Sequence, residues 1–375
     1  MTQPPPMKSI PMKTASSSRH LFSVIPMVLA IALLAGTSAH AERVEGRFTY
    51  QDYGDGVARP INDVKVEIWR YKPGLFGIWG WSMDRRVWTN WNGEISVDMP
   101  WAARGTVYAL RVYASNAYVT VWPHDTAHVG ESWYNEPPQQ KAWNSSDVLN
   151  FTFNFDAWHA ARNFNIARTL WFAGEYMTHR YAQLGKVNAQ TTEMYSTFYD
   201  PAGDTIQMNI DRDFNDASIV HEYGHFVQEQ IGSLPWEPTV HYVCNAYNTG
   251  LAWMEGFAGY FPLAVARAFP GELQTGLSYS VESGNSCSGT PADSVEYFVS
   301  ATLWDLVDNG WENYSWSEPH DWTGDNDWVI LSILDNELGA FGSRPTIWDF
   351  RNAWYARGMP GDALDSILRK HGILQ

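Results

Sequence analysis

The stretch that decides the fold is SIVHEYGHFVQEQIG, Ser218–Gly232, which combines helical spacing of apolar residues with an HExxH motif. On an α-helix, residues four apart share one face, so His221 and His225 can present two imidazoles to one metal ion at about 2.0–2.1 Å. Glu222 would flank the metal without binding it, where its carboxylate can take a proton from a water that the metal activates. The alternative is two surface histidines on an amphipathic helix.

A third candidate ligand follows at Glu255, after 29 intervening residues. It lies near the start of a second predicted helix, LAWMEGFAGYF, which can pack antiparallel to the first. Three protein ligands with one open position are typical of a catalytic zinc site. The cofactor expected here is therefore Zn2+.

The combination of HEYGH with WMEGFA resembles the gluzincin zinc metallopeptidases, with the spacing of the fungalysin and thermolysin-like zincins. The later ATLWDLVD, Ala301–Asp308, resembles a helix that follows the third ligand in such enzymes, and the similar region spans Thr192–Asn309. The resemblance implies hydrolysis of peptide bonds in a protein or peptide substrate. The zinc ligands that it implies are His221, His225 and Glu255, and the general base and proton shuttle is Glu222.

The sequence departs from the gluzincin pattern one turn after the glutamate ligand, where Gly259 replaces an aspartate that orients the first histidine in many members. Asp305 or Asp308 could substitute for it. A donor to the oxyanion of the tetrahedral intermediate is also expected from a later segment. The candidates for this donor, none with a motif around it, are Tyr297, His320 and His371.

Residues 42–123 are predicted to form an all-β sandwich, because VKVEIW, GEISVDM and TVYALRVYA alternate apolar and polar residues. Between two such runs, Asn92-Gly93 can take the positive φ values that a tight hairpin turn needs. The run RPINDVKVEIW is similar to transthyretin-like or carboxypeptidase regulatory-like modules, which accompany a catalytic domain and lack chemistry of their own.

Residues 124–155 have the polar, proline-containing composition of a connector, with one further strand expected at VLNFTFNF. From residue 156 to 375 the apolar period is about 3.6, which predicts a mainly helical zincin-like domain. Two strand-like pieces, EMYSTFYD and TIQMNI, precede the HExxH helix, and TIQMNI is expected to offer an edge to an extended substrate. The predicted fold class is α+β, with an N-terminal β-sandwich followed by this catalytic domain.

Residues 1–41 are predicted to be a signal peptide, because basic residues precede a short apolar run, Leu21–Gly36, and small residues precede a cleavage point after Ala41. An uncleaved anchor is the alternative. The expected location is secreted or periplasmic, with no membrane span after cleavage. A formal net charge of -16 disfavours nucleic acid as a partner.

The two cysteines, Cys244 and Cys287, lie in the exported part and bracket the Glu255 helix, so we expect them to form a disulfide. The 20 tryptophans suit either packing or contact with glycans. Two acidic clusters, DRDFND and DWTGDND, suit solvated loops or caps better than calcium sites. A rival to the peptidase is a catalytically inactive secreted protein that binds a glycan or protein ligand on a zincin scaffold.

Overall fold

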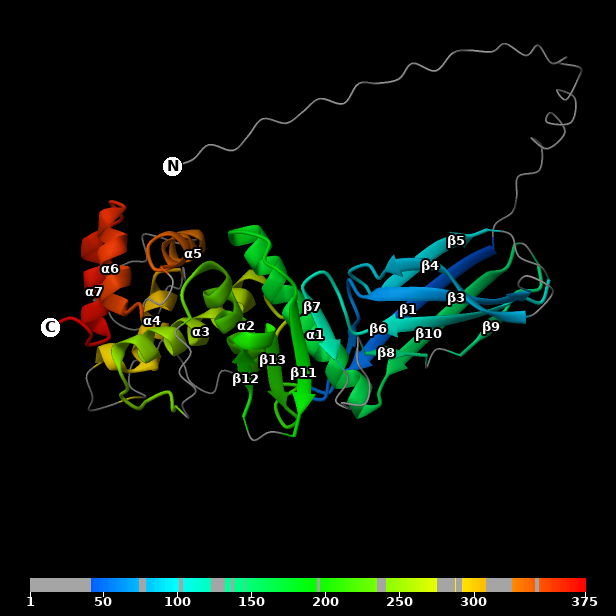
Figure 1. Ribbon diagram of the computed structural model, residues 1–375, viewed down its shortest axis with the longest axis horizontal. Helices are drawn as coiled ribbons and strands as arrows, with labels where there is room; N and C mark the ends of the chain where they lie inside the picture. The colour runs from blue at the N-terminus through cyan, green and yellow to red at the C-terminus, as the bar shows by residue number, and fades with distance from the viewer. Residues whose placement is uncertain are drawn as a thin grey trace, which may run out of the picture. The chain divides into compact units, whose positions relative to one another are not determined.

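The computed structural model describes residues 42–73, 79–100, 104–122, 132–135, 138–144, 146–193, 196–234, 241–274, 287, 292–307, 326–340 and 344–375. The predicted signal peptide lies outside these residues. Within them, the fold is α+β as predicted, and an all-β region precedes the helices (Figure 1).

The all-β region contains two sheets. The first has the order β10-β1-β2, with β5 also paired to β1, and the second has the order β4-β3-β6-β8, with β9 also paired to β6. Alternate residues of the strands are buried, as Val44 and Phe48 in β1 and Val66 in β3 illustrate. The strands of the first sheet are β1 (Glu42–Gln51), β2 (Ala58–Pro60), β5 (Glu94–Met99) and β10 (Val148–Phe155). Those of the second sheet are β3 (Lys65–Pro73), β4 (Trp79–Trp88), β6 (Val107–Tyr113), β8 (Trp133–Tyr134) and β9 (Gln140–Lys141).

The turn at Asn92-Gly93 differs from the predicted hairpin. Gly93 has a positive φ of 73°, and Asn92 is not among the positive-φ residues. The strands on either side pair with different partners, β4 with β3 and β5 with β1. The turn therefore carries the chain from one sheet to the other.

A third sheet has the order β12-β13-β11-β7 and contains the two strand-like pieces that precede the HExxH helix. The prediction that TIQMNI forms an edge is wrong, since β13 is paired on both sides, with β11 and with β12. The edges of this sheet are β12 and β7. Its strands are β7 (Val119–Trp122), β11 (Val187–Thr192), β12 (Phe198–Asp200) and β13 (Thr205–Asn209).

The predicted connector contributes paired strands. The expected strand at VLNFTFNF is confirmed as β10, which runs parallel to β1. At the other boundary, β7 pairs in parallel with β11 of the third sheet. The chain thus crosses between sheets near both ends of the connector, and its division at residues 123 and 155 stays a prediction.

The helical segments follow the predicted order. α2 begins after Asn215, whose side chain accepts a hydrogen bond from the Ser218 backbone at 3.0 Å, and Gly232 is its C-cap. α1 ends at Arg180. The helices are α1 (Trp158–Arg180), α2 (Asp216–Ile231), α3 (Thr249–Ala268), α4 (Glu296–Asp305), α5 (Asp327–Asn336), α6 (Ile347–Ala356) and α7 (Gly361–Lys370), with short 3-10 turns at Pro201–Gly203 and Ala292–Ser294.

Close packing of α2 on α3 brings the two helices of the HExxH region together. A Cβ at Gly224 would lie 3.0 Å from Ala258 Cα and 3.2 Å from Phe261 Cβ, so a larger residue would push the helices apart. The predicted disulfide Cys244–Cys287 is confirmed, and it joins the segments before and after α3. Among the described residues, no helix has both the length and the apolarity needed to span a bilayer.

Candidate metal centre

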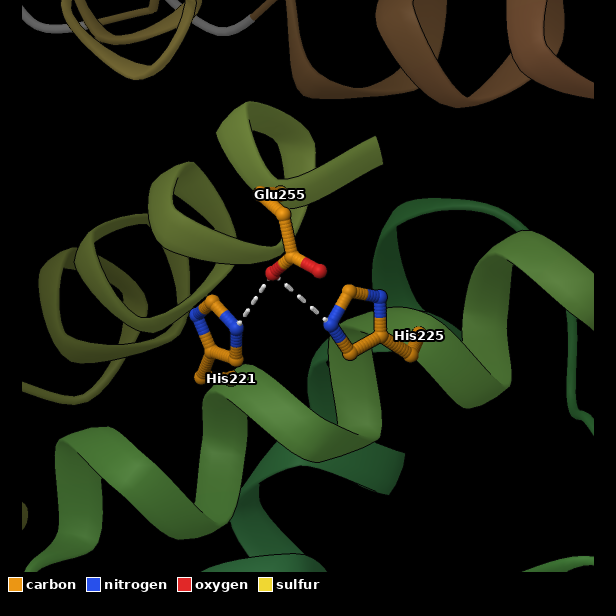
Figure 2. Close-up of side chains that lie close together, drawn as sticks. All are labelled: His221, His225 and Glu255. Atoms are coloured by element: carbon orange, nitrogen blue, oxygen red, sulfur yellow. Dashed lines mark hydrogen bonds and ion pairs between the residues drawn. The ribbon is translucent and has the colours of Figure 1, made fainter. Parts of the chain in front are cut away.

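Three of the predicted ligand atoms lie together at the crossing of α2 and α3. Glu255 Oε2 is 3.2 Å from His221 Nε2 and 3.2 Å from His225 Nε2. Figure 2 shows the Glu255 carboxylate reaching from α3 toward both imidazoles of α2. Donors bound tetrahedrally at zinc distances lie about 3.3–3.4 Å apart. The two distances from Glu255 Oε2 therefore fit donors that share one zinc ion.

The carboxylate of Glu255 and the two imidazoles stabilise one another's charged forms. Glu255 is 5% exposed and His225 is 8% exposed. Burial alone would raise the pKa of Glu255, but the imidazoles of His225 and His221 hold it well below its usual range. Burial would likewise lower the pKa of His225, but the Glu255 carboxylate raises it to about 9. A metal ion would bind the neutral imidazoles and the carboxylate, so its binding would release the protons that this ion-paired state holds.

Glu222 lies on the same helix but outside the group of mutually close donors. Its side chain is buried, and this burial raises the pKa of its carboxyl above the usual value, although the neighbouring imidazoles of His221 and His225 act in the opposite direction. A buried carboxylate with a raised pKa beside a cation site is suited to taking a proton.

Gln228, one turn further along α2, contacts the His225 ring on its Nδ1 side, away from Glu255. Its Oε1 lies 3.2 Å from His225 Nδ1, which fixes the ring so that Nε2 faces Glu255. The expectation that Asp305 orients His221 is wrong, because Asp305 Oδ2 lies 2.9 Å from His371 Nε2 and 3.1 Å from Lys370 Nζ. Asp308 lies outside the described residues.

A further histidine, His241, joins the cluster from the segment before α3. Its Nε2 is 3.2 Å from Glu255 Oε2, and its Nδ1 is 2.7 Å from Glu296 Oε2 on α4. His241, Glu255 and Glu296 thus make a second group of close donors. No motif surrounds His241 in the sequence, which makes it only the first alternative ligand should Glu255 not bind the metal.

Two of the three candidates for the oxyanion donor, Tyr297 and His371, are among the described residues. The Tyr297 side chain is fully buried and packs on Phe298. His371 is buried against Asp305. His320 lies outside the described residues. His371 is thus already engaged by Asp305, and the role of oxyanion donor stays a prediction for Tyr297.

The two acidic clusters are partly built into the interior. Asp216 accepts hydrogen bonds from Thr169 Oγ1 at 2.7 Å and from the Gln274 backbone at 2.7 Å. Asp327 is fully buried and accepts hydrogen bonds from Tyr176 and Tyr260 at 2.6 and 3.0 Å. These two carboxylates are structural acceptors, so the expectation of solvated loops or caps is wrong for Asp327.

Comparison with known families places the donor cluster inside a recognised region. Residues 170–326 match the family model described as the mycolysin C-terminal domain, which is less than half of the chain. The matched range contains α2, α3 and all of the donors named above. The match supports a relation between this part of the chain and the zincin metallopeptidases.

One similar protein is an uncharacterized protein of Archaeoglobus fulgidus, which is 32% identical over 168 residues. The alignment covers 44% of this chain and 48% of that protein, so the chain spans about half the length of the curated relative that it matches.

Solved structures show only weak likeness. (S)-allantoin synthase has a TM-score of 0.21 at 9% identity, covering 34% of this chain and 45% of that one. A 9R-lipoxygenase from Cyanothece PCC8801 has a TM-score of 0.19 at 10% identity, covering 38% and 24%. The shaft pilin SpaA from Lactobacillus rhamnosus GG has a TM-score of 0.16 at 16% identity, covering 31% and 49%. None of these carries an argument about fold or function.

Proposed function

We propose that this chain is an exported zinc metallopeptidase that hydrolyses peptide bonds. The observation that carries the proposal is the position of Glu255 Oε2, 3.2 Å from the Nε2 atoms of both His221 and His225. The match of residues 170–326 to the mycolysin C-terminal domain supports it. Cleavage of the first 41 residues after Ala41 and the division into sandwich, connector and catalytic domain belong to the same proposal.

His221, His225 and Glu255 would hold the zinc ion, which when bound supplies Lewis acidity and lowers the pKa of bound water toward 7. Glu222 takes the proton of the attacking water on its carboxylate and passes it to the leaving amine. Burial of Glu222 and Glu255 keeps bulk water away from both groups, which strengthens their electrostatic interactions.

His241 is the residue that we assign to the oxyanion. Its Nδ1 lies 2.7 Å from Glu296 Oε2, and its Nε2 lies 3.2 Å from Glu255 Oε2 in the donor cluster. His241 belongs to the segment before α3, so it approaches the cluster from outside α2. From there it can donate a hydrogen bond to the carbonyl oxygen of the substrate as negative charge develops on it. Glu296 acts through His241 and is a positioning residue.

The test of the proposal compares Glu222→Gln with His221→Ala, measuring zinc content and cleavage of unfolded casein. Glu222→Gln should keep about one zinc per chain and lose at least about a hundredfold in turnover, the lower end of what a general base contributes. His221→Ala should lose the metal. The matched control is Glu229→Gln on the same helix, which should cleave at the parent's rate.

Two results would contradict the proposal. One is a Glu222→Gln variant that cleaves as fast as the parent. The other is a zinc-loaded parent that cleaves no protein or peptide offered, which would favour a binding protein on a zincin scaffold. His241→Ala and Glu296→Gln separate the roles of that pair: both should lower turnover while zinc content holds. A loss of zinc in His241→Ala would instead make His241 a ligand.

A further inference from the structure

A cavity lies apart from the donor cluster, where four chain segments meet. Its volume is about 360 Å³, within the range of pockets that take small ligands. The turn after β1 contributes Tyr53, the start of α1 contributes Trp158, and Gln274 enters from the segment after α3. The segment between β13 and α2 contributes Asp213 and Phe214, together with Asp211 and Asn215.

One wall of the cavity is aromatic. The ring centroids of Tyr53 and Trp158 are 4.7 Å apart, those of Trp158 and Phe214 are 4.9 Å apart, and those of Tyr53 and Phe214 are 5.5 Å apart. Because the rings touch one another, they form a continuous wall and do not enclose a cation from three sides. Trp158 is 47% exposed, which leaves much of its surface available to a ligand.

Two polar groups in the cavity have unmet hydrogen-bonding capacity. Asp213 is 1% exposed, and among the described residues its Oδ2 accepts no hydrogen bond. The nearest cationic atom, Arg162 Nη1, is 3.8 Å away, which is too far for a hydrogen bond. Gln274 Nε2 is also buried without an acceptor in this part of the chain. Buried polar atoms are normally satisfied, so a group that donates to Asp213 and accepts from Gln274 would complete the site.

The position of Gln274 depends on Gly54, which also lines the cavity. A Cβ at Gly54 would lie 2.5 Å from Gln274 Oε1 and 2.6 Å from its Nε2, so any side chain there would displace the amide. Rotation of this amide would exchange its donor and acceptor ends. A hydroxyl group satisfies either orientation, because it both donates and accepts.

The chemistry of these groups distinguishes among ligands. An alkylammonium only donates hydrogen bonds and would leave the Gln274 donor unmet. Calcium takes six to eight oxygen ligands, and here Asn215 Oδ1 is already used as the cap of α2. A sugar ring has an apolar face for an aromatic wall and adjacent hydroxyls for a carboxylate and an amide. We propose that this cavity binds a pyranose unit of a carbohydrate, with Trp158 stacking on the ring and Asp213 and Gln274 bonding its hydroxyls.

The experiment uses the full, zinc-loaded chain and a panel of glucose, galactose, mannose and N-acetylglucosamine, followed by saturation-transfer NMR and tryptophan fluorescence. At least one sugar should bind, and Trp158→Ala and Asp213→Asn should each weaken it by at least about tenfold, as expected for loss of an aromatic anchor or a charged hydrogen bond. The matched control is Trp328→Ala, which removes a ring that is 56% exposed on α5, and it should bind as the parent does.

Trp158→Ala keeps the test decisive if Asp213→Asn does not fold, since Trp158 is on the rim. The proposal is overturned if no sugar in the panel binds, if both cavity variants bind as tightly as the parent, or if only tetramethylammonium or Ca2+ binds in a way that these variants abolish. Glu222→Gln should bind sugar as the parent does, so a failed peptidase assignment leaves this result unaffected.

The source of the sugar is resolved by two further arms. Soluble polysaccharides are offered in one, and glycoproteins before and after enzymatic removal of their glycans in the other. Binding in either arm that is lost in Trp158→Ala supports the proposal and identifies the source. The proposal is overturned if neither arm shows binding that is lost in Trp158→Ala.

Discussion

Gly256, the neighbour of the proposed ligand Glu255, lies where α3 packs closely against α4. A larger side chain at this position would therefore also disturb the site. A Cβ at this position would lie 2.5 Å from Val299 Cβ, 2.6 Å from Val299 Cγ1 and 3.0 Å from the Glu296 carbonyl oxygen. Ordinary contacts begin at 3.4 Å, so Gly256→Ala requires α3 and α4 to separate by about 0.9 Å, the difference between 3.4 and 2.5 Å. α4 also carries Glu296, which holds His241.

The expected cost of this substitution follows from two opposing effects. Alanine favours a helix over glycine by about 1 kcal/mol, whereas overpacking a core costs typically 1–3 kcal/mol. A contact as short as 2.5 Å places this variant at the upper end, so we expect a net loss of about 1–2 kcal/mol. The shift between Glu255 and the His241–Glu296 pair should reduce turnover more strongly, since displacements near 1 Å can cost about a hundredfold.

The assay combines urea unfolding with zinc content and casein cleavage. Gly80→Ala is the control, because a Cβ at Gly80 meets no atom within 4 Å, and it should leave both unfolding and cleavage unchanged. A Gly256→Ala variant as stable and as active as the parent would show that the α3–α4 contact does not set the geometry of the site, and the reasoning above would fail.

Three further predictions concern the disulfide, a buried acid and the metal. Replacing Cys244 and Cys287 by serine opens a loop of 43 residues and should lower the free energy of unfolding by roughly 3–4 kcal/mol, measured in urea; an unchanged midpoint would contradict this. Burial raises the pKa of Asp213 from 3.8 to about 7, so the native state holds a proton that the unfolded chain releases, and stability should fall as pH rises from about 4 to about 7. Asp213→Asn should remove this fall and be more stable than the parent at pH 8, by at most about 4 kcal/mol, and equal thermal midpoints at pH 8 would argue against a buried, destabilising carboxylate. Dialysis against a chelator should lower the melting temperature, with about 4 kcal/mol returned at zinc a thousandfold above its Kd, and Glu255→Ala should show no such response; an equal response would move the ligand role to another residue.

The sequence predicted the parts of the site that lie on regular elements. HEYGH on one helix fixes His221 and His225 by period alone, and Glu255 follows from its spacing and from the resemblance. Strand alternation predicted the sandwich and β10 for the same reason, since period two determines which side chains are buried.

The parts that were missed depend on contacts between distant segments. His241 reaches the cluster because α4, 55 residues later, supplies Glu296, and no local pattern encodes that meeting. The pairing of β13 on both sides and the separation of β4 from β5 into different sheets were likewise missed, because strand period does not specify the partner strand. The cavity at Trp158 joins four segments and had no motif.

The pairing of β1 with β10 has a consequence for the order in which this chain can fold. Arg43 of β1 pairs with Val148 of β10, which is 105 residues later in the chain (148 minus 43). β1 therefore cannot form this pairing until β10 has been synthesised. β7 similarly waits for β11, which ends at Thr192. On a ribosome, neither sheet can be completed until these later strands have emerged. About two-fifths of the 375 residues, up to Phe155, are synthesised before β1 has β10 as its partner, and about half before β7 has β11. Long-range pairing of this kind is slow to form, and it keeps the nascent N-terminal half open during the interval in which an export pathway would engage it.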